Sequence, residues 1–213
     1  MRELHGHNGN TLDAAFDQDG IRMATSGEDG HVRVWDLSNL ENPDEARRHE
    51  IGGPHFSAAA FLSNNSNQIV VTLSENINRG GAPKDFTAKS YDLEKQSFVT
   101  AFVGHNDWLT CLAQDPRDRW IATGSLDKTI RIFDGHTGEL RHLLEGHSDR
   151  ILSMASLEDG KRLVSVAANK TMRVWNTETG AMTGKWTLAS HPIDVVAQSG
   201  SKLIATTNQG GII

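Results

Sequence analysis

Three groups of side chains in this sequence contain the residue types that hydrolytic catalysis uses. Each group has a histidine, a hydroxyl residue 18 positions later and an Asp or Asn four positions after that: His7, Thr25 and Asp29; His105, Thr123 and Asp127; His147, Ser165 and Asn169. In a catalytic triad the histidine takes a proton from the hydroxyl, and a carboxylate orients the imidazole. The same residue types can also satisfy one another's hydrogen bonds inside a buried sheet.

The segments that carry the hydroxyl residues favour the structural role. Thr123 ends the short run Trp120-Ile121-Ala122-Thr123, and such an apolar run between turns is typical of a strand. A hydroxyl nucleophile instead stands on a sharp strand-to-helix turn beside an oxyanion-hole loop, and no segment of that kind stands out in the sequence. We therefore interpret the three groups as structural hydrogen-bond networks, and we expect no catalytic residue and no enzymatic activity.

A glycine precedes each of the three histidines, and an aromatic residue followed by Asp or Asn lies 28 positions after each: Trp35-Asp36, Phe133-Asp134 and Trp175-Asn176. A spacing held three times predicts a unit of roughly forty residues used repeatedly. Within one such unit, 109–144, turn residues at 115–118, 127–128 and 137–138 separate four short strand-like runs. No helix-period apolar stripe of useful length appears, so we predict an all-β fold built from four-stranded antiparallel sheets.

Gly-His, an Asp in a tight turn and then Trp-Asp resemble the WD-repeat (WD40) family of β-propellers, over nearly the whole chain. The resemblance implies four recognisable four-stranded blades and a partial fifth. It also implies a hydrogen-bonded chain of histidine, Ser or Thr, Asp and Trp inside each blade, which adds Trp35 and Trp175 to the networks. Phe133 cannot donate a hydrogen bond and Asn169 is uncharged, so we expect their blades to be weaker by about 1 kcal/mol each.

The repeat spacing predicts one propeller region over 1–213 with several units. They lie at about 6–50, 54–103, 104–145 and 146–189, with a partial unit at 190–213 and the outer strand of a preceding or closing blade at 1–5. Because an open arc exposes strand edges and apolar blade faces, we favour an incomplete ring that is a piece of a larger propeller. A compact five-bladed ring and closure through a second chain are the alternatives.

The composition restricts the classes of partner and the compartment. The formal net charge is −6 and the basic residues form no run, which argues against nucleic acid and anionic membranes. Cys111 is the single cysteine, and neither an apolar signal segment nor a membrane-length apolar run appears, so we predict an intracellular protein, cytoplasmic or nuclear. The histidines lack the spacing of a zinc site and glycine-rich phosphate loops are absent, so we expect no metal and no cofactor.

Propellers of this family bind partners mainly on the face that carries the loops before each first strand and the loops between second and third strands. Asn10, Trp108 and Arg150 occupy one equivalent position on that face, three residues after each repeat histidine. The long polar loop 74–84 would add three charged residues to the same face: Glu75, Arg79 and Lys84.

Trp108 is the leading candidate anchor on this face, because a Trp near an Arg is typical of interface anchors. Its packing on a neighbouring blade is the alternative, and we expect Trp120 and Trp186 to be packing residues. The resemblance and this face predict a non-catalytic scaffold or adaptor that binds protein or peptide partners. The alternative is a ligand-sensing or substrate-receptor repeat region of a larger signalling, immunity-type or ubiquitin-ligase protein.

Overall fold

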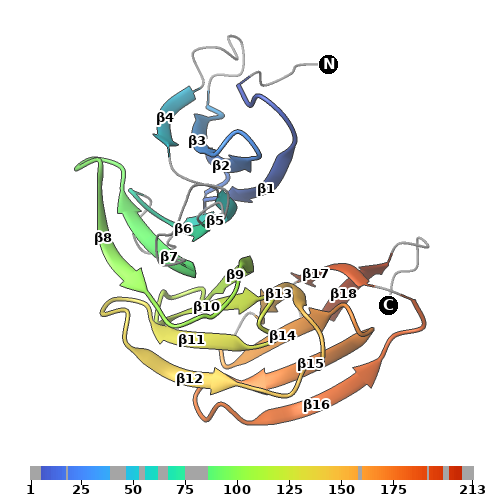
Figure 1. Cartoon of the computed structure of the whole chain (residues 1–213). Helices are drawn as coiled ribbons and strands as arrows, with labels where there is room; N and C mark the ends of the chain where they lie inside the picture. Colours follow the sequence, from blue (N-terminus) through green and yellow to red (C-terminus); the bar gives the residue numbers. More distant parts are fainter. Residues whose placement is uncertain are drawn as a thin grey trace. The chain divides into compact units, whose positions relative to one another are not determined.

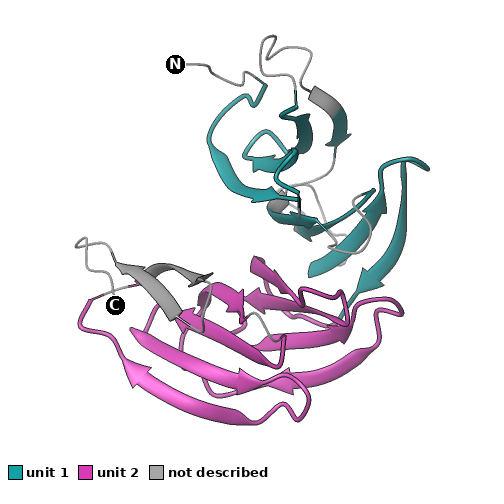
Figure 2. Cartoon of the chain, turned by 180° about the vertical axis from the view of Figure 1, so that it is seen from behind, with its two compact units in different colours: residues 1–103 teal, residues 104–213 magenta. Residues whose placement is uncertain are grey.

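The computed structural model describes residues 6–17, 19–38, 47–52, 56–61, 67–74, 86–157, 160–190, 192–198 and 202–207. Every helix or strand assigned within these residues is a β-strand (Figure 1). The strands form antiparallel sheets, which confirms the predicted all-β fold of four-stranded sheets. The chain divides into two compact units, residues 1–103 and 104–213, which Figure 2 colours teal and magenta. Within the described ranges, no helix is long and apolar enough to span a membrane.

Unit 1 contains two four-stranded sheets, each with its strands in chain order. The strands of the first sheet are β1 (Thr11–Phe16), β2 (Arg22–Gly27), β3 (His31–Asp36) and β4 (Arg47–Gly52). Those of the second are β5 (Phe56–Phe61), β6 (Gln68–Ser74), β7 (Phe86–Asp92) and β8 (Ser97–Phe102). The first sheet packs its inner strands β1 and β2 against β5, so apolar residues of both sheets share one core.

Unit 2 contains two further four-stranded sheets and a pair of strands. The third sheet has β9 (Leu109–Gln114), β10 (Trp120–Ser125), β11 (Ile130–Asp134) and β12 (Leu140–Leu144). The fourth has β13 (Ile151–Ser156), β14 (Arg162–Ala167), β15 (Thr171–Asn176) and β16 (Met182–Thr187). The fifth sheet, as described, pairs β17 (Pro192–Gln198) with β18 (Lys202–Thr207).

The inner strands of unit 2 stack in sequence, with β13 against β9 on one side and β17 on the other (Figure 1). Burial follows this stacking. All six residues of β10 are buried, whereas the outer strand β16 is exposed at every position except the half-buried Gly184. Trp120 is buried, and its Nε1–H donates to the Gly160 carbonyl oxygen at 2.8 Å, so it packs between the third and fourth sheets.

Trp186 contradicts the expectation that it is a packing residue, because half of its surface is exposed on β16. Its ring lies along its own strand, so close to Gly184 that a Cβ atom added there would clash with the indole Cη2 atom. The sequence alone could not show this, because exposure of an outer-strand residue depends on the sheet that stacks beside it.

Tight turns between the second and third strands share one backbone conformation. The third residue of the turn has a positive φ: 75° at Gly30, 71° at Lys128 and 62° at Lys170. Each donates its N–H to the carbonyl oxygen of the last residue of the preceding strand, as Lys170 does to Ala167 at 3.1 Å. Because side chains disfavour this left-handed conformation, the two lysines store strain that glycine avoids.

Candidate functional site

In the first sheet, four predicted network residues form one hydrogen-bonded chain. The Trp35 Nε1–H donates to the Thr25 Oγ1 at 2.8 Å, and the same hydroxyl lies 2.8 Å from the His7 Nε2. The His7 Nδ1 lies 2.9 Å from the Asp29 Oδ1, so the imidazole joins the Thr25 hydroxyl to the carboxylate.

The carboxylate of Asp29 also forms an ion pair with a buried arginine of this sheet. Arg33 is buried, and its Nη1 and Nη2 groups donate to Asp29 at 2.8 Å and to Glu50 at 2.7 Å. Burial acts to raise the pKa of Asp29, but hydrogen bonds from His7, the Asn8 N–H and Arg33 outweigh it and hold that pKa well below its ordinary value. Asp29 thus stays ionised and orients the imidazole.

In the third sheet the network lacks its aromatic donor, since Phe133 occupies the indole position. The His105 Nε2 lies 2.7 Å from the Thr123 Oγ1, and its Nδ1 lies 2.8 Å from the Asp127 Oδ2. The Thr129 hydroxyl donates to the other oxygen of Asp127 at 2.6 Å. Burial opposes ionisation of Asp127, yet the bonds from His105 and Thr129 hold its pKa well below the ordinary value.

In the fourth sheet, two uncharged side chains, those of Thr171 and Asn169, stand in the place of the carboxylate. The Trp175 Nε1–H donates to the Ser165 Oγ at 2.9 Å, and Ser165 lies 2.8 Å from the His147 Nε2. The His147 Nδ1 then meets the Thr171 Oγ1 at 2.9 Å, and Thr171 donates to the Asn169 Oδ1 at 2.6 Å. Asn169 therefore reaches His147 through Thr171 rather than directly.

The protonation of His147 depends on these uncharged neighbours. Burial, together with the positive charges of Arg173 and Lys185, lowers the pKa of His147 to about 4. No carboxylate in its network offsets this effect, so His147 is a neutral imidazole at pH 7.

Sequence reasoning missed Thr171 and the arginines of the third strands. A signal for both was present, because Thr171 repeats Thr129 two positions after the turn residue, and Arg33, Arg131 and Arg173 each lie two positions before the aromatic residue. Arg33 and Arg173 are buried charged residues, which are costly without partners. Arg33 has its two carboxylates, and Arg173 donates to the Gly146 carbonyl oxygen.

The geometry of the three networks does not suit nucleophilic catalysis. The hydroxyl residues Thr25, Thr123 and Ser165 are all buried on second strands. In two networks an indole N–H also donates to the hydroxyl oxygen, so attack on a substrate would require that bond to break. Within the described residues, no group of three or more His, Cys, Asp or Glu side chains could hold a metal ion.

The candidate face residues occupy equivalent places in three sheets. The carbonyl oxygens of Asn10, Trp108 and Arg150 accept hydrogen bonds of 2.8–3.0 Å from the N–H groups of Glu28, Leu126 and Ala168, respectively. Each bond ties the loop before the first strand to the turn between the second and third strands. Asn10 and Arg150 are exposed, and Trp108 is half-buried. Glu75, Arg79 and Lys84 lie outside the described residues.

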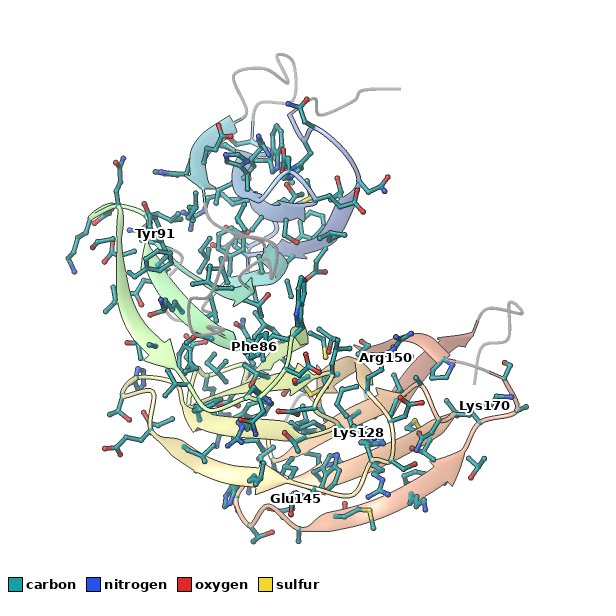
Figure 3. The ribbon with its side chains drawn as sticks, in the orientation of Figure 1. Phe86, Tyr91, Lys128, Glu145, Arg150 and Lys170 are labelled. Carbon is teal, nitrogen blue, oxygen red and sulfur yellow. The ribbon has the colours of Figure 1, made fainter. Side chains whose placement is uncertain are left out.

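Basic side chains surround this face in unit 2. Lys128 and Lys170 lie in the β10–β11 and β14–β15 turns, and Arg150 directly precedes β13 (Figure 3). Lys128 and Arg150 are exposed, and Lys170 is half-buried. Asp107 and Asp149 accept hydrogen bonds from the backbone N–H groups of Trp108 and Arg150, and Asp127 directly precedes Lys128 in its turn.

A separate cavity of about 170 Å³ lies between the third and fourth sheets, near the ends of the strands opposite that face. Seven residues line it: Arg119, Trp120, Arg141, His142, Gly160, Thr177 and Glu178. Arg119 is paired with the buried Asp115, and Arg141 with Asp134. These carboxylates balance the charges of both guanidinium groups.

Comparison with known proteins identifies the family to which the repeat is similar. Residues 1–36, 96–134 and 138–176, together more than half of the chain, match a family model described as "WD domain, G-beta repeat". A periodic tryptophan protein 2 homolog of Dictyostelium discoideum is 31% identical over 174 residues, which are 81% of this chain and 17% of that protein.

Two further relatives have unrelated names. Autophagy-related protein 16 of Arabidopsis thaliana is 26% identical, over 84% of this chain and 32% of that protein. The WD repeat and HMG-box DNA-binding protein 1 of Mus musculus is 25% identical, over 82% of this chain and 19% of that protein. The chain therefore spans less than a third of the length of these three relatives.

Proposed function

Because this chain belongs to the WD-repeat family, whose members generally act as protein-interaction scaffolds, we propose that it is a non-catalytic scaffold or adaptor. Its binding face in unit 2 is the set of loops and turns around Trp108, Lys128, Arg150 and Lys170, here called the loop face. The observation that carries this proposal is the repeated backbone bond between each pre-strand loop and its neighbouring turn. Such bonds fix the loops before a partner binds, which reduces the entropy lost on association.

The charges of the loop face suggest the chemistry of the partner. The chain as a whole is acidic, with a formal net charge of −6, yet Lys128, Arg150 and Lys170 gather on this set of loops. A half-buried Trp108 among them supplies an apolar contact. A peptide with acidic residues beside an apolar side chain would complement both features.

The hydrogen-bond networks have a supporting role in this proposal. They connect the pre-strand loop, which carries the histidine, to the second and third strands, and so hold the loop in place. We keep the repeat units at 6–50, 54–103, 104–145, 146–189 and 190–213 as one propeller region, and we keep the intracellular location, as parts of the same proposal.

A second candidate function is the receptor or sensing region of a larger protein. The short share of each relative that this chain covers, between 17% and 32% for the three above, favours it. One of these relatives is named as DNA-binding, so our expectation that nucleic acid is not a partner stays a prediction.

The proposal is tested by capturing partners with the tagged chain and mapping contacts by cross-linking mass spectrometry. The double variant Lys128→Glu and Arg150→Glu should reduce recovery of a direct partner at least tenfold. Arg117→Glu with Lys161→Glu is the matched control, since both residues are exposed and lie in the β9–β10 and β13–β14 turns at the opposite strand ends. Equal recovery with both double variants, or cross-links confined to 115–119 and 160–162, would refute the loop face.

A further inference from the structure

One buried arginine of the fourth sheet has no carboxylate beside it among the residues that the structure describes. Arg173 of β15 is 8% exposed, and its Nη2 group donates to the Gly146 carbonyl oxygen. Its Nη1 group lies 3.3 Å from the Met182 sulfur atom, and a thioether is only a weak acceptor. The Trp175 ring, whose centre is 5.8 Å from the Arg173 Cζ, attracts the cation more weakly than a carboxylate does. A buried charge without a counter-charge is costly, so this guanidinium favours an anion that reaches it.

The first sheet shows which group meets an arginine at this place in the repeat. Arg33 occupies the same place, and it donates to Asp29 of the turn and to Glu50 of the outer strand β4. Glu50 is also the residue that pairs with Arg33 in the β3–β4 register. One carboxylate therefore reaches the guanidinium from the turn, and a second reaches it from the outer strand.

In the fourth sheet other residues occupy both acidic positions. Asn169 stands at the turn position, and Lys185 is the residue of β16 that pairs with Arg173. Like charges directly opposite each other on neighbouring strands destabilise the pair. Lys185 is exposed, and Glu145, which precedes Gly146, forms no ion pair with either base in the described part of the chain. The two bases therefore carry a positive charge that their own sheet does not balance.

The third sheet lacks this combination. Its arginine, Arg131, is only half-buried, so water solvates part of the guanidinium. The residue opposite Arg131 in the register is the apolar Leu143, so a second base is not added there. A deeply buried arginine beside a second base occurs in the fourth sheet, which makes that sheet the stronger place for an anion.

The two bases lie on the side of the fourth sheet that faces the third, between two complete four-stranded sheets (Figure 1). Arg173 and Trp175 are two positions apart, so they lie on the same face of β15. Trp175 shares a core cluster with Leu144 of β12, which identifies that face. Lys185 pairs with Arg173, so its side chain is on the same face. The fifth sheet stacks on the other face and does not affect this place.

We propose that Arg173 and Lys185 form a binding site for one carboxylate group, which an Asp or Glu side chain of a partner protein supplies. The carboxylate takes the place that Glu50 has beside Arg33, and it displaces the Met182 side chain. Met182 is 47% exposed and unbranched, so it moves aside without loss of core packing. The site lies outside the loop face and does not depend on it.

His147 provides an internal sensor of such binding. Burial lowers the pKa of His147, and the positive charges of Arg173 and Lys185 lower it further. A carboxylate bound to the two bases offsets their charge, so it should raise the pKa of His147.

The probe is N-acetyl-glutamate N-methylamide, whose side-chain carboxylate is its single charge, and the corresponding glutamine compound is the uncharged control. Each is titrated into the full chain at constant ionic strength, while NMR follows the Arg173 guanidinium and the His147 ring. Two charge-assisted contacts should give the glutamate probe a dissociation constant of about 1–10 mM. The glutamine probe should shift neither signal.

The variant Lys185→Glu supplies the carboxylate from within the chain, as Glu50 does in the first sheet. Its Arg173 signal should lie near the ligand-bound position before any probe is added, and its affinity for the glutamate probe should fall at least tenfold. Lys170→Glu is the matched control, because it makes the same charge change in the same sheet but on the loop face, and it should leave the affinity unchanged. Lys185 is exposed, so its replacement leaves the fold intact, which a melting curve verifies.

Absence of a saturable shift in the wild-type chain overturns the proposal, and so does an equal response to the glutamine probe. An affinity that is unchanged in Lys185→Glu overturns it as well. Equal loss of affinity in the two variants would mean that the probe is attracted to basic surface in general, which also contradicts a site at Arg173 and Lys185.

Discussion

Acid should destabilise this protein through His147 before it affects the carboxylates of the other two networks. Burial and the charges of Arg173 and Lys185 lower the pKa of His147 to about 4 from its ordinary value of 6.5. Between these values the unfolded chain binds a proton that the folded chain does not, so the free energy of unfolding falls as the pH falls. The loss is complete near pH 4 and absent above about pH 7.

The size of the stability loss follows from the difference between the folded and unfolded pKa values of His147. Each pH unit costs up to about 1.4 kcal/mol, so the loss from His147 reaches about 2 kcal/mol at pH 5. The carboxyl pKa values of Asp29 and Asp127 are lowered by their networks, so the stability that they contribute is present above their unfolded value and is lost only below about pH 4. The interval from pH 7 to pH 5 therefore separates the effect of His147 from that of these two carboxylates.

The variant Asn169→Asp supplies the matched comparison, because it gives the fourth sheet the carboxylate that Asp127 supplies in the third. The new carboxylate favours the imidazolium form of His147 and raises its pKa, so the slope between pH 7 and pH 5 should shrink by at least half. Urea unfolding at several pH values measures the slopes, and an NMR titration of the His147 ring gives its pKa directly. A wild-type stability that is flat over this interval, or equal slopes in both proteins, would refute the reasoning.

Three further changes have expected outcomes in thermal or urea unfolding at pH 7.5. Thr171→Val leaves the His147 Nδ1–H without its acceptor and should cost about 1–3 kcal/mol, and a cost below 0.5 kcal/mol would mean that water replaces the hydroxyl. Trp35→Phe reproduces the arrangement at Phe133 and should cost about 1–2 kcal/mol of unfolding free energy. If Thr25→Val costs as much in the Phe variant as in the wild type, loss of the Trp35–Thr25 hydrogen bond does not explain this cost. Lys170→Gly relieves a φ of 62° and should leave stability unchanged or raise it by up to about 1 kcal/mol, while a clear loss would show that the lysine side chain stabilises the turn.

The repeat spacing determined much of this protein before any coordinates. Short turns and antiparallel strands make distance along the sequence equivalent to position in the sheet, so a hydroxyl 18 positions after a histidine comes beside it. The structure brings His7, Thr25, Asp29 and Trp35 into one chain of bonds for this reason. The all-β fold and the WD-repeat family were confirmed on the same pattern.

The spacing could not predict the contacts between side chains of different elements. The spacing places Asn169 at the turn, but only the distances across the sheet show that Thr171 stands between it and His147. The pattern also marks Arg33 as one of three repeated arginines, yet its two carboxylate partners come from a turn and an outer strand whose approach depends on the fold.

The sequence by itself therefore determined the strands, their order within each sheet and the residues that share a register, because these depend on local turns and on a fixed period. The tertiary structure decided which side chains are covered. Leu144 and Trp186 occupy the same place in the repeat, and both are apolar, but one is buried and the other is half-exposed. The difference arises from the neighbouring sheet, since burial is a property of what packs against a residue rather than of the residue's own strand.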